Sequence, residues 1–251
     1  MSVNREIWQR TFNDKSAPPW PCPTCRDGLL TVIKKTLVSE QQADSRKLQG
    51  CIGQYPDQMK FRFSVLFICT NPNCEEIVSV CGDSHLAEVE DFDGNAGWVE
   101  FYQPTHFNPA PPIFTISRNC PEVVSSEINK CFSLFWSDYP ATSNRIRVAI
   151  EKLLNHQNIA KTKINIKKRK REKITLHHRI EAFKAKNSDL AESLLAIKWL
   201  GNSGSHDSNI SLKDIFDAFD ILEHTINELY ESRQKKVKKL TKAINKRKGP
   251  V

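Results

Sequence analysis

The chain has 251 residues, of which 39% are hydrophobic and 26% charged, and its formal net charge is +8. This composition is that of a folded protein and excludes a disordered chain. The charge is unevenly spread, because residues 161–173 and 233–251 carry formal charges of +7 and +9, which leaves −8 on the rest. A uniformly basic nucleic-acid-binding globule is therefore excluded.

The apolar segments are short. The longest runs, such as residues 65–69, fall far below the roughly 18 residues that span a bilayer. Residues 1–12 also lack the apolar centre of a signal peptide. The sequence therefore predicts a cytoplasmic protein with no membrane contact.

Residues 1–105 are predicted to form a small β module that begins with a short helix. Residues 29–38 and 60–68 have the composition of paired strands, and apolar residues alternate with polar ones in the second. Further strands are expected at 77–81 and 98–102. The proline-rich residues 106–120 are expected to form an extended linker.

From Pro121 onward the pattern becomes helical. Apolar residues recur at spacings of three and four through residues 121–232, which predicts a bundle of five helices. The segment from Ser211 to Asp214 resembles a capping box at the start of the fifth. Residues 161–173 are predicted to be a surface loop, and 233–251 a basic tail. Both are either solvated charge or contacts to RNA or DNA.

Two closely spaced cysteine pairs are the strongest chemical signal in the sequence. Cys22 and Cys25 are separated by two residues on one predicted turn, and Cys69 and Cys74 flank another. Turns of this kind let four thiolates converge on one tetrahedral ion, which predicts a structural Zn²⁺ in a zinc-ribbon layout. The alternative is four reduced thiols without a metal. With a different register, Cys51 or Cys81 would replace one of the ligands.

A polar box at residues 198–206 joins the fourth and fifth predicted helices. Gly201 can end the fourth helix, and Asn202 and the following residues favour a turn. In one interpretation His206 only bridges this turn by a hydrogen bond. In the other, Asn202 and His206 line a polar pocket, where His206 acts as a general acid or base on RNA.

The helical part resembles the bacterial "domain of unknown function 4145" family. The resemblance rests on residues 144–154 (NRIRVAIEKLL) and on the box at 198–206 (KWLGNSGSH). It implies a helical fold of the HEPN superfamily, which includes RNases and nucleotide- or RNA-binding proteins of bacterial defence and toxin systems. It also implies a homodimer with the box at its interface, and members often carry a zinc-ribbon-like module.

The box departs from the pattern of the catalytic HEPN proteins, which place an Arg before the His with a spacer of four to six residues between them. Counted back from His206, the corresponding positions are Gly201, Leu200 and Trp199. Those positions hold no Arg in this chain. Arg145, Arg147 or Arg179 could supply the cation that phosphoryl transfer needs. For Arg145 and Arg147, however, an ion pair with a nearby acid is the simpler interpretation, such as Glu151, which lies four residues after Arg147.

The predicted fold class is α+β, with a small zinc-ribbon β module followed by a HEPN-like all-α helical bundle. The function expected from it is that of a non-catalytic or regulatory, nucleic-acid-associated protein in a bacterial defence or stress system. One alternative is a metal-independent endoribonuclease that uses His206, with Asn202 and Arg145 as further candidates. Another is an interaction scaffold that pairs with itself or with an operon-encoded protein.

Overall fold

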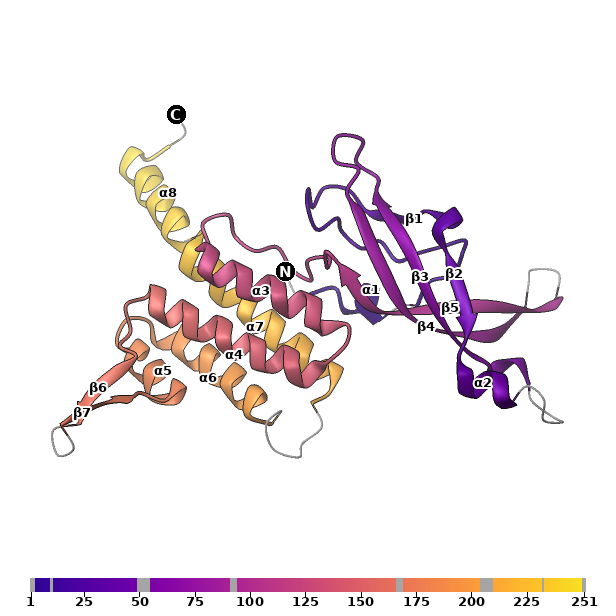
Figure 1. Cartoon of the computed structure of the whole chain (residues 1–251). Coiled ribbons are helices and arrows are strands. Elements are labelled where there is room, and N and C mark those ends of the chain that lie inside the picture. Colours follow the sequence, from indigo (N-terminus) through magenta and orange to yellow (C-terminus); the bar gives the residue numbers. More distant parts are fainter. Residues whose placement is uncertain are drawn as a thin grey trace. The chain divides into compact units, whose positions relative to one another are not determined.

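A computed structural model describes most of the chain in two compact units (Figure 1). The sheet unit comprises Asn4–Ile113 and Phe132–Asp138, and the helical unit comprises Met1–Val3, Phe114–Cys131 and Tyr139–Val251. The described residues are 3–9, 11–48, 55–90, 94–165, 169–203, 210–231 and 233–249; the side chains of 48, 201–203 and 233–236 lie outside this description.

The sheet unit is built on a five-stranded antiparallel sheet that curls into a half-barrel (Figure 1). Its strands are β1 (Leu30–Val32), β2 (Val38–Gln41), β3 (Lys60–Cys69), β4 (Ile77–Glu90) and β5 (Ala96–Asn108). β2 pairs with the first half of β3 and β1 with its end, while β4 lies between β3 and β5. The unit also contains the short helices α1 (Arg5–Gln9) and α2 (Ala43–Leu48), and 3-10 turns at Lys34–Thr36 and Pro56–Gln58.

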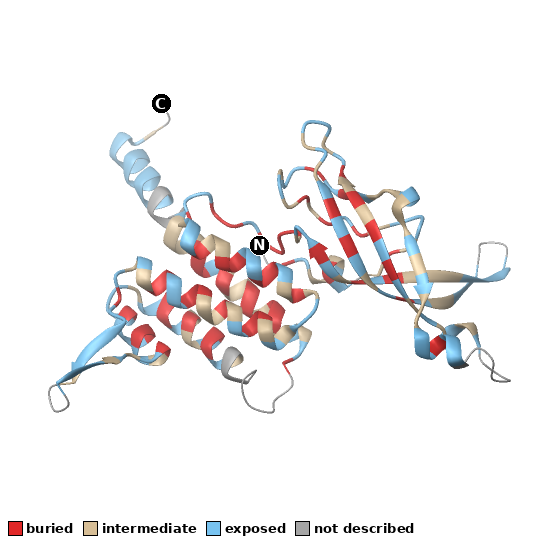
Figure 2. Cartoon of the chain, in the orientation of Figure 1, coloured by how far each residue is buried: buried red, intermediate tan, exposed pale blue. Residues whose placement is uncertain are grey.

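One face of the sheet carries the core of this unit. Phe63, Val65 and Phe67 of β3 are buried, whereas Arg62 before them and Ser64 between them are exposed, as alternation in a half-buried strand requires (Figure 2). The N-terminal segment covers this face with a cluster of aromatic rings. Phe12 also exchanges two backbone hydrogen bonds with Tyr102, of 3.0 and 2.8 Å, which fixes the segment to β5.

A bulge at Cys81 and Gly82 interrupts the pairing of β4 with β5. A Cβ atom at Gly82 would lie 2.1 Å from the carbonyl oxygen of Gln103, so only glycine allows this approach of the two backbones. Bulges increase the local twist of a strand. This one lies where the sheet needs curvature to form a half-barrel.

The helical unit consists of packed helices and one β-hairpin. Its elements are α3 (Glu122–Phe135, whose last residues belong to the sheet unit), α4 (Tyr139–His156), β6 (Thr162–Asn165), β7 (Lys170–Lys173), α5 (Leu176–Lys184), α6 (Ser188–Ser203), α7 (Leu212–Tyr230) and α8 (Arg233–Arg247). The apolar stripes of α3 to α7 form its core (Figure 2). The predicted capping box is confirmed, because the Ser211 side chain accepts from the Asp214 N–H and the Asp214 carboxylate accepts from the Ser211 N–H.

The two basic segments contain regular secondary structure. Residues 161–173 contain the antiparallel hairpin β6–β7 where the sequence predicted a loop, and most of 233–251 forms α8. The proline-rich residues 106–120 differ from an extended linker, because β5 continues to Asn108 and Ile113, Phe114 and Ile116 are buried. Buried apolar side chains hold this stretch in place.

The predicted fold class is wrong in two respects. A curled sheet with strands of up to 14 residues takes the place of a small zinc ribbon, and the C-terminal part contains a hairpin and is not an all-α HEPN bundle. The order of a sheet followed by helices fits the prediction in part. The errors arose because the outer halves of β4 and β5 and all of β6–β7 are largely exposed, so they lack the apolar alternation that signals a strand.

The described helices include none that combines the length and the apolar character needed to cross a membrane.

Candidate metal centre

Two tight turns of the sheet unit present the paired cysteines. In the first, the Arg26 N–H donates to the Cys22 carbonyl (3.1 Å), and the Cys22 N–H donates to the Gly28 carbonyl (2.8 Å). In the second, Cys69 ends β3, and the Cys74 N–H donates to the Asn71 carbonyl (2.9 Å). Each turn is therefore closed by its own backbone hydrogen bonds.

The pairing of β1 with β3 brings the two turns together. Leu30 at the start of β1 lies opposite Cys69, and the Thr70 N–H donates to the Leu29 carbonyl at 2.9 Å. A side-chain hydrogen bond also joins the two turns, because the Thr24 hydroxyl of the first turn donates at 2.6 Å to the carboxylate of Glu76, which follows the second turn. The sheet register thus sets the distance between cysteines that are more than 40 residues apart in sequence.

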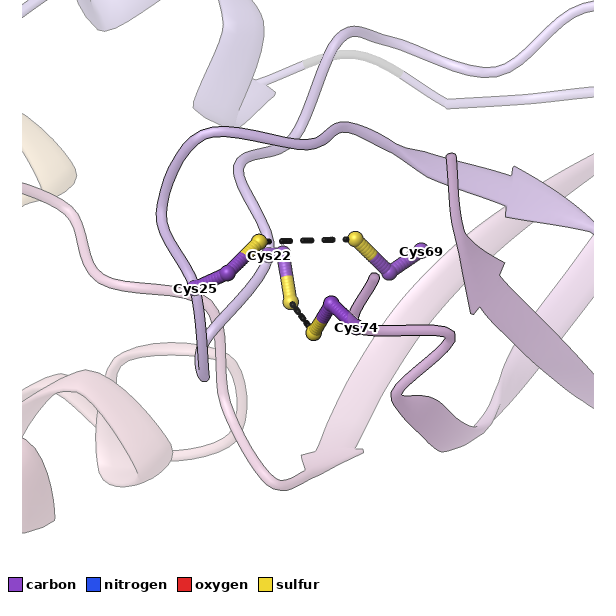
Figure 3. Close-up of side chains that lie close together, drawn as sticks. All are labelled: Cys22, Cys25, Cys69 and Cys74. Carbon is purple, nitrogen blue, oxygen red and sulfur yellow. Dashed lines mark hydrogen bonds between the residues drawn. The ribbon is translucent and has the colours of Figure 1, made fainter. Parts of the chain in front are cut away.

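The four predicted ligands form one cluster (Figure 3). Their sulfur atoms all lie within 4.8 Å of one another, with Sγ–Sγ distances of 3.8 Å for Cys22–Cys74 and 3.6 Å for Cys25–Cys69. Cys22 and Cys69 are buried, and Cys25 and Cys74 are half-buried. The prediction that these cysteines converge on a possible metal site is confirmed.

Backbone N–H groups point at the sulfur atoms. Thr24, Gly28 and Asn71 donate to the sulfurs of Cys22, Cys25 and Cys69 at 3.4, 3.3 and 3.4 Å. The Gly28 bond is the main reason why the pKa of the Cys25 thiol falls to about 6, whereas burial raises that of Cys69 to about 12. A divalent cation at the centre would offset half of the negative charge of four partly buried thiolates.

Gly28 is a site residue that the sequence analysis did not single out. A Cβ atom there would lie 2.4 Å from the Cys69 sulfur and 2.9 Å from the Asn71 nitrogen. Because any larger residue would displace a ligand, glycine is required at this position. The signal available in the sequence was a glycine three residues after the second cysteine of the first pair.

The other cysteines that the structure describes stand apart from this centre. Cys81 is exposed on β4, while Cys120 and Cys131 are buried, as expected for small apolar residues. Burial raises the pKa of Cys120 to about 11 and that of Cys131 further. Cys51 lies outside the described residues.

The candidate catalytic residues are not shown as a group. His206 and the side chain of Asn202 lie outside the described part of the chain, although the backbone of Asn202 belongs to α6. Arg145 donates to Glu127 at 2.9 Å, across from α4 to α3, and Lys130 donates to the other carboxylate oxygen at 2.8 Å. The described contact of Arg145 therefore links two helices.

The buried carboxylate of Glu127 should stabilise the helical unit in a pH-dependent way. The hydrogen bond from Lys130, then that from Arg145, keeps the pKa of Glu127 below its usual range despite burial. Its contribution is therefore complete above the unfolded pKa of about 4.3 and is lost as the pH falls through the lower folded value. We expect Glu127→Gln to lower the unfolding free energy at pH 7 by about 1–2 kcal/mol, since both partners are partly exposed.

Urea denaturation followed by far-UV circular dichroism measures this effect. The exposed Glu122→Gln on the same helix is the matched control and should cost less than about 0.5 kcal/mol. The difference between wild type and Glu127→Gln should shrink on acidification. A difference that is absent at pH 7, or that grows as the pH falls, contradicts the assignment.

The fold and the site together define a two-unit protein with a four-cysteine centre in its sheet unit. Comparison with known families divides the chain in a similar way. Residues 129–247 match the family model described as "Domain of unknown function (DUF4145)", which confirms the resemblance predicted from the sequence. Residues 10–110 match a second, "Domain of unknown function (DUF8608)". No curated protein and no solved structure matches the chain.

Proposed function

We propose that this protein is a zinc-stabilised, nucleic-acid-associated protein with a non-catalytic or regulatory role. Its basic segments, 161–173 and 233–251, would bind the phosphates of RNA or DNA without sequence preference. The context of bacterial defence or stress and a homodimer through the helical unit are proposed from the family resemblance alone. Nothing in the described residues favours the endoribonuclease over this role.

The observation that carries the proposal is that both basic segments project from the packed helices and expose their cations. In Figure 1, β6–β7 and α8 extend away from the packed helices α3–α7 of the same unit. All six Lys and Arg side chains described in 161–173 are exposed, and so are those described in α8. Cations on projecting elements can approach a phosphate backbone although the rest of the chain carries a formal charge of −8.

Zinc is the metal that we propose for the four cysteines. A tetrahedral Zn²⁺ has Zn–S distances of about 2.3 Å, which places its sulfur ligands about 3.8 Å apart. The Sγ–Sγ distances of 3.6 Å for Cys25–Cys69 and 3.8 Å for Cys22–Cys74 fit that spacing. A four-sulfur zinc site has no open position for water, so it would hold the two turns together without catalysing a reaction.

Charge reversal on α8 tests the nucleic-acid proposal in the full-length chain. We expect Lys238→Glu/Lys239→Glu/Lys242→Glu to weaken binding to a fluorescein-labelled single-stranded RNA at least tenfold at low salt. The reason is that three exposed cations near phosphates become three repelling carboxylates. Fluorescence anisotropy measures the affinity, and deletion of 233–251 should weaken it further.

The matched control keeps the charge of the same helix. Asn245 is exposed on α8, and Asn245→Ala should leave the affinity within about twofold of wild type. Equal affinities of wild type and the triple variant, or no binding of RNA or duplex DNA by wild type at low salt, would remove the basis of the proposal.

A further inference from the structure

A cavity of about 440 Å³ lies in the helical unit at the base of the basic hairpin. Its walls come from the second half of α4, from both ends of the β6–β7 hairpin and from the start of α5. The hairpin is closed there by a hydrogen bond of 2.9 Å from the Ile174 N–H to the Lys161 carbonyl. The volume falls within the range of about 300–1,000 Å³ that is usual for sites of small ligands.

Cations dominate the lining of this cavity. It contains Lys152, Lys161, Lys173 and Arg179 against the single carboxylate of Glu151, a net formal charge of +3. The lysines are exposed, so their charges are hydrated and mobile. Together with Arg179 they would stabilise an anion bound in the cavity through several positive charges at once.

Arg179 is the fixed member of this group. It is only 5% exposed, and its guanidinium donates to the Asn155 Oδ1 (2.7 Å) and to the carbonyls of Ala160 (3.1 Å) and Ile159 (3.2 Å). These bonds use Nε and Nη2, and all three acceptors are neutral. Among the described residues no carboxylate lies within ion-pair distance of Arg179. A buried guanidinium whose hydrogen bonds all go to neutral acceptors is costly. The charge of Glu151, which lines the same cavity, offsets part of that cost, and an anion in the cavity would offset more of it.

The start of α5 adds to the same field. The helix begins at Leu176, which lines the cavity, so the positive end of its dipole lies at the cavity wall. Thr175 caps this end by accepting from the His178 N–H. The site therefore combines a rigid guanidinium, three mobile ammonium groups and a helix N-terminus, which together favour a phosphate.

We propose that this cavity binds the phosphate of a single nucleotide, either free or at the 5′ end of a strand. Glu151 would accept a hydrogen bond from a ribose hydroxyl, as carboxylates do in other nucleotide sites. The volume is suited to one nucleotide and not to a continuous strand. The strand-end form rests on the proposed nucleic-acid function, whereas binding of a free nucleotide does not.

Three probes distinguish the two sources of the phosphate. They are AMP with adenosine as its reference, and one short oligoribonucleotide prepared with a 5′-phosphate and with a 5′-hydroxyl. The full-length chain should bind AMP but not adenosine in isothermal titration calorimetry. If the strand end is the ligand, the phosphorylated oligonucleotide should also bind about tenfold more tightly than its hydroxyl form, the effect of one or two charge-assisted hydrogen bonds.

Two variants locate the binding site. Lys161→Gln/Lys173→Gln should abolish the preference for phosphate, because both side chains line the cavity. Lys170→Gln is the matched control, since it removes one exposed charge from the same hairpin outside the cavity lining. It should leave the preference unchanged. Because all three lysines are exposed, the fold should survive, which circular dichroism checks.

The outcomes separate this inference from the proposed function. AMP binding without oligonucleotide binding supports the cavity and contradicts the nucleic-acid proposal. Tight binding of both oligonucleotides to the same degree, with no AMP binding, overturns the cavity and leaves the nucleic-acid proposal intact. A phosphate preference that persists in Lys161→Gln/Lys173→Gln also overturns it.

Discussion

A Cys69→Ser variant should purify without stoichiometric zinc and with an unfolded sheet unit. Cys69 is 3% exposed and ends the strand β3, so its loss removes a proposed zinc ligand and the anchor of one turn. Structural zinc sites contribute about 10–16 kcal/mol of apparent binding energy, which equals or exceeds the whole stability of a typical domain. Zinc content by plasma mass spectrometry and the near-UV circular dichroism of the tryptophans measure the two effects.

Cys81→Ser is the matched control for this substitution. Cys81 is exposed on β4 and lies outside the four-cysteine cluster. This variant should keep one zinc ion per chain and the wild-type spectrum. Zinc retained by Cys69→Ser at the wild-type level, or lost equally from Cys81→Ser, contradicts the assignment of the ligands.

Trp20→Ala should destabilise the sheet unit by about 3–5 kcal/mol. Trp20 is fully buried, and its ring packs edge-on against Phe107 at 5.1 Å and Trp136 at 5.6 Å between centroids. Its indole N–H also donates to the Ile7 carbonyl at 2.9 Å. Truncation leaves a large cavity just before the first cysteine turn and removes the side-chain donor to the Ile7 carbonyl. Urea denaturation followed by near-UV circular dichroism measures the loss.

The same truncation at an exposed tryptophan of the sheet unit provides the comparison. Trp98 on β5 is 44% exposed, and Trp98→Ala should cost less than about 1 kcal/mol. If the two substitutions cost the same, Trp20 does not have the central packing role that its burial indicates.

The four-cysteine cluster was predictable because its signals are local. The two cysteine pairs each lie on one turn, and the short spacing within a pair is visible in the sequence. What brings the pairs together is the register of β1 on β3, and spacing alone does not give that register. The need for glycine at position 28 follows only from its approach to Cys69 across that register.

The helices were predictable for a similar reason, whereas the hairpin β6–β7 and the contact between Arg145 and Glu127 were not. Buried stripes on α3 to α7 leave a period of about 3.6 residues in the sequence, and the Ser211 cap is a four-residue signal. The hairpin β6–β7 has exposed residues on both faces, so no pattern marks it. The pairing of Arg145 with Glu127 joins residues 18 apart on different helices, beyond the reach of a helical spacing rule.

The salt dependence of RNA binding tests the central claim most directly. If the hairpin and α8 together contact about six phosphates, the logarithm of the association constant should fall with the logarithm of salt concentration with a slope of about −4. The slope should be about half as steep after deletion of 233–251, because the hairpin contacts alone remain. A slope near zero for the full-length chain, or one unchanged by the deletion, would contradict the account.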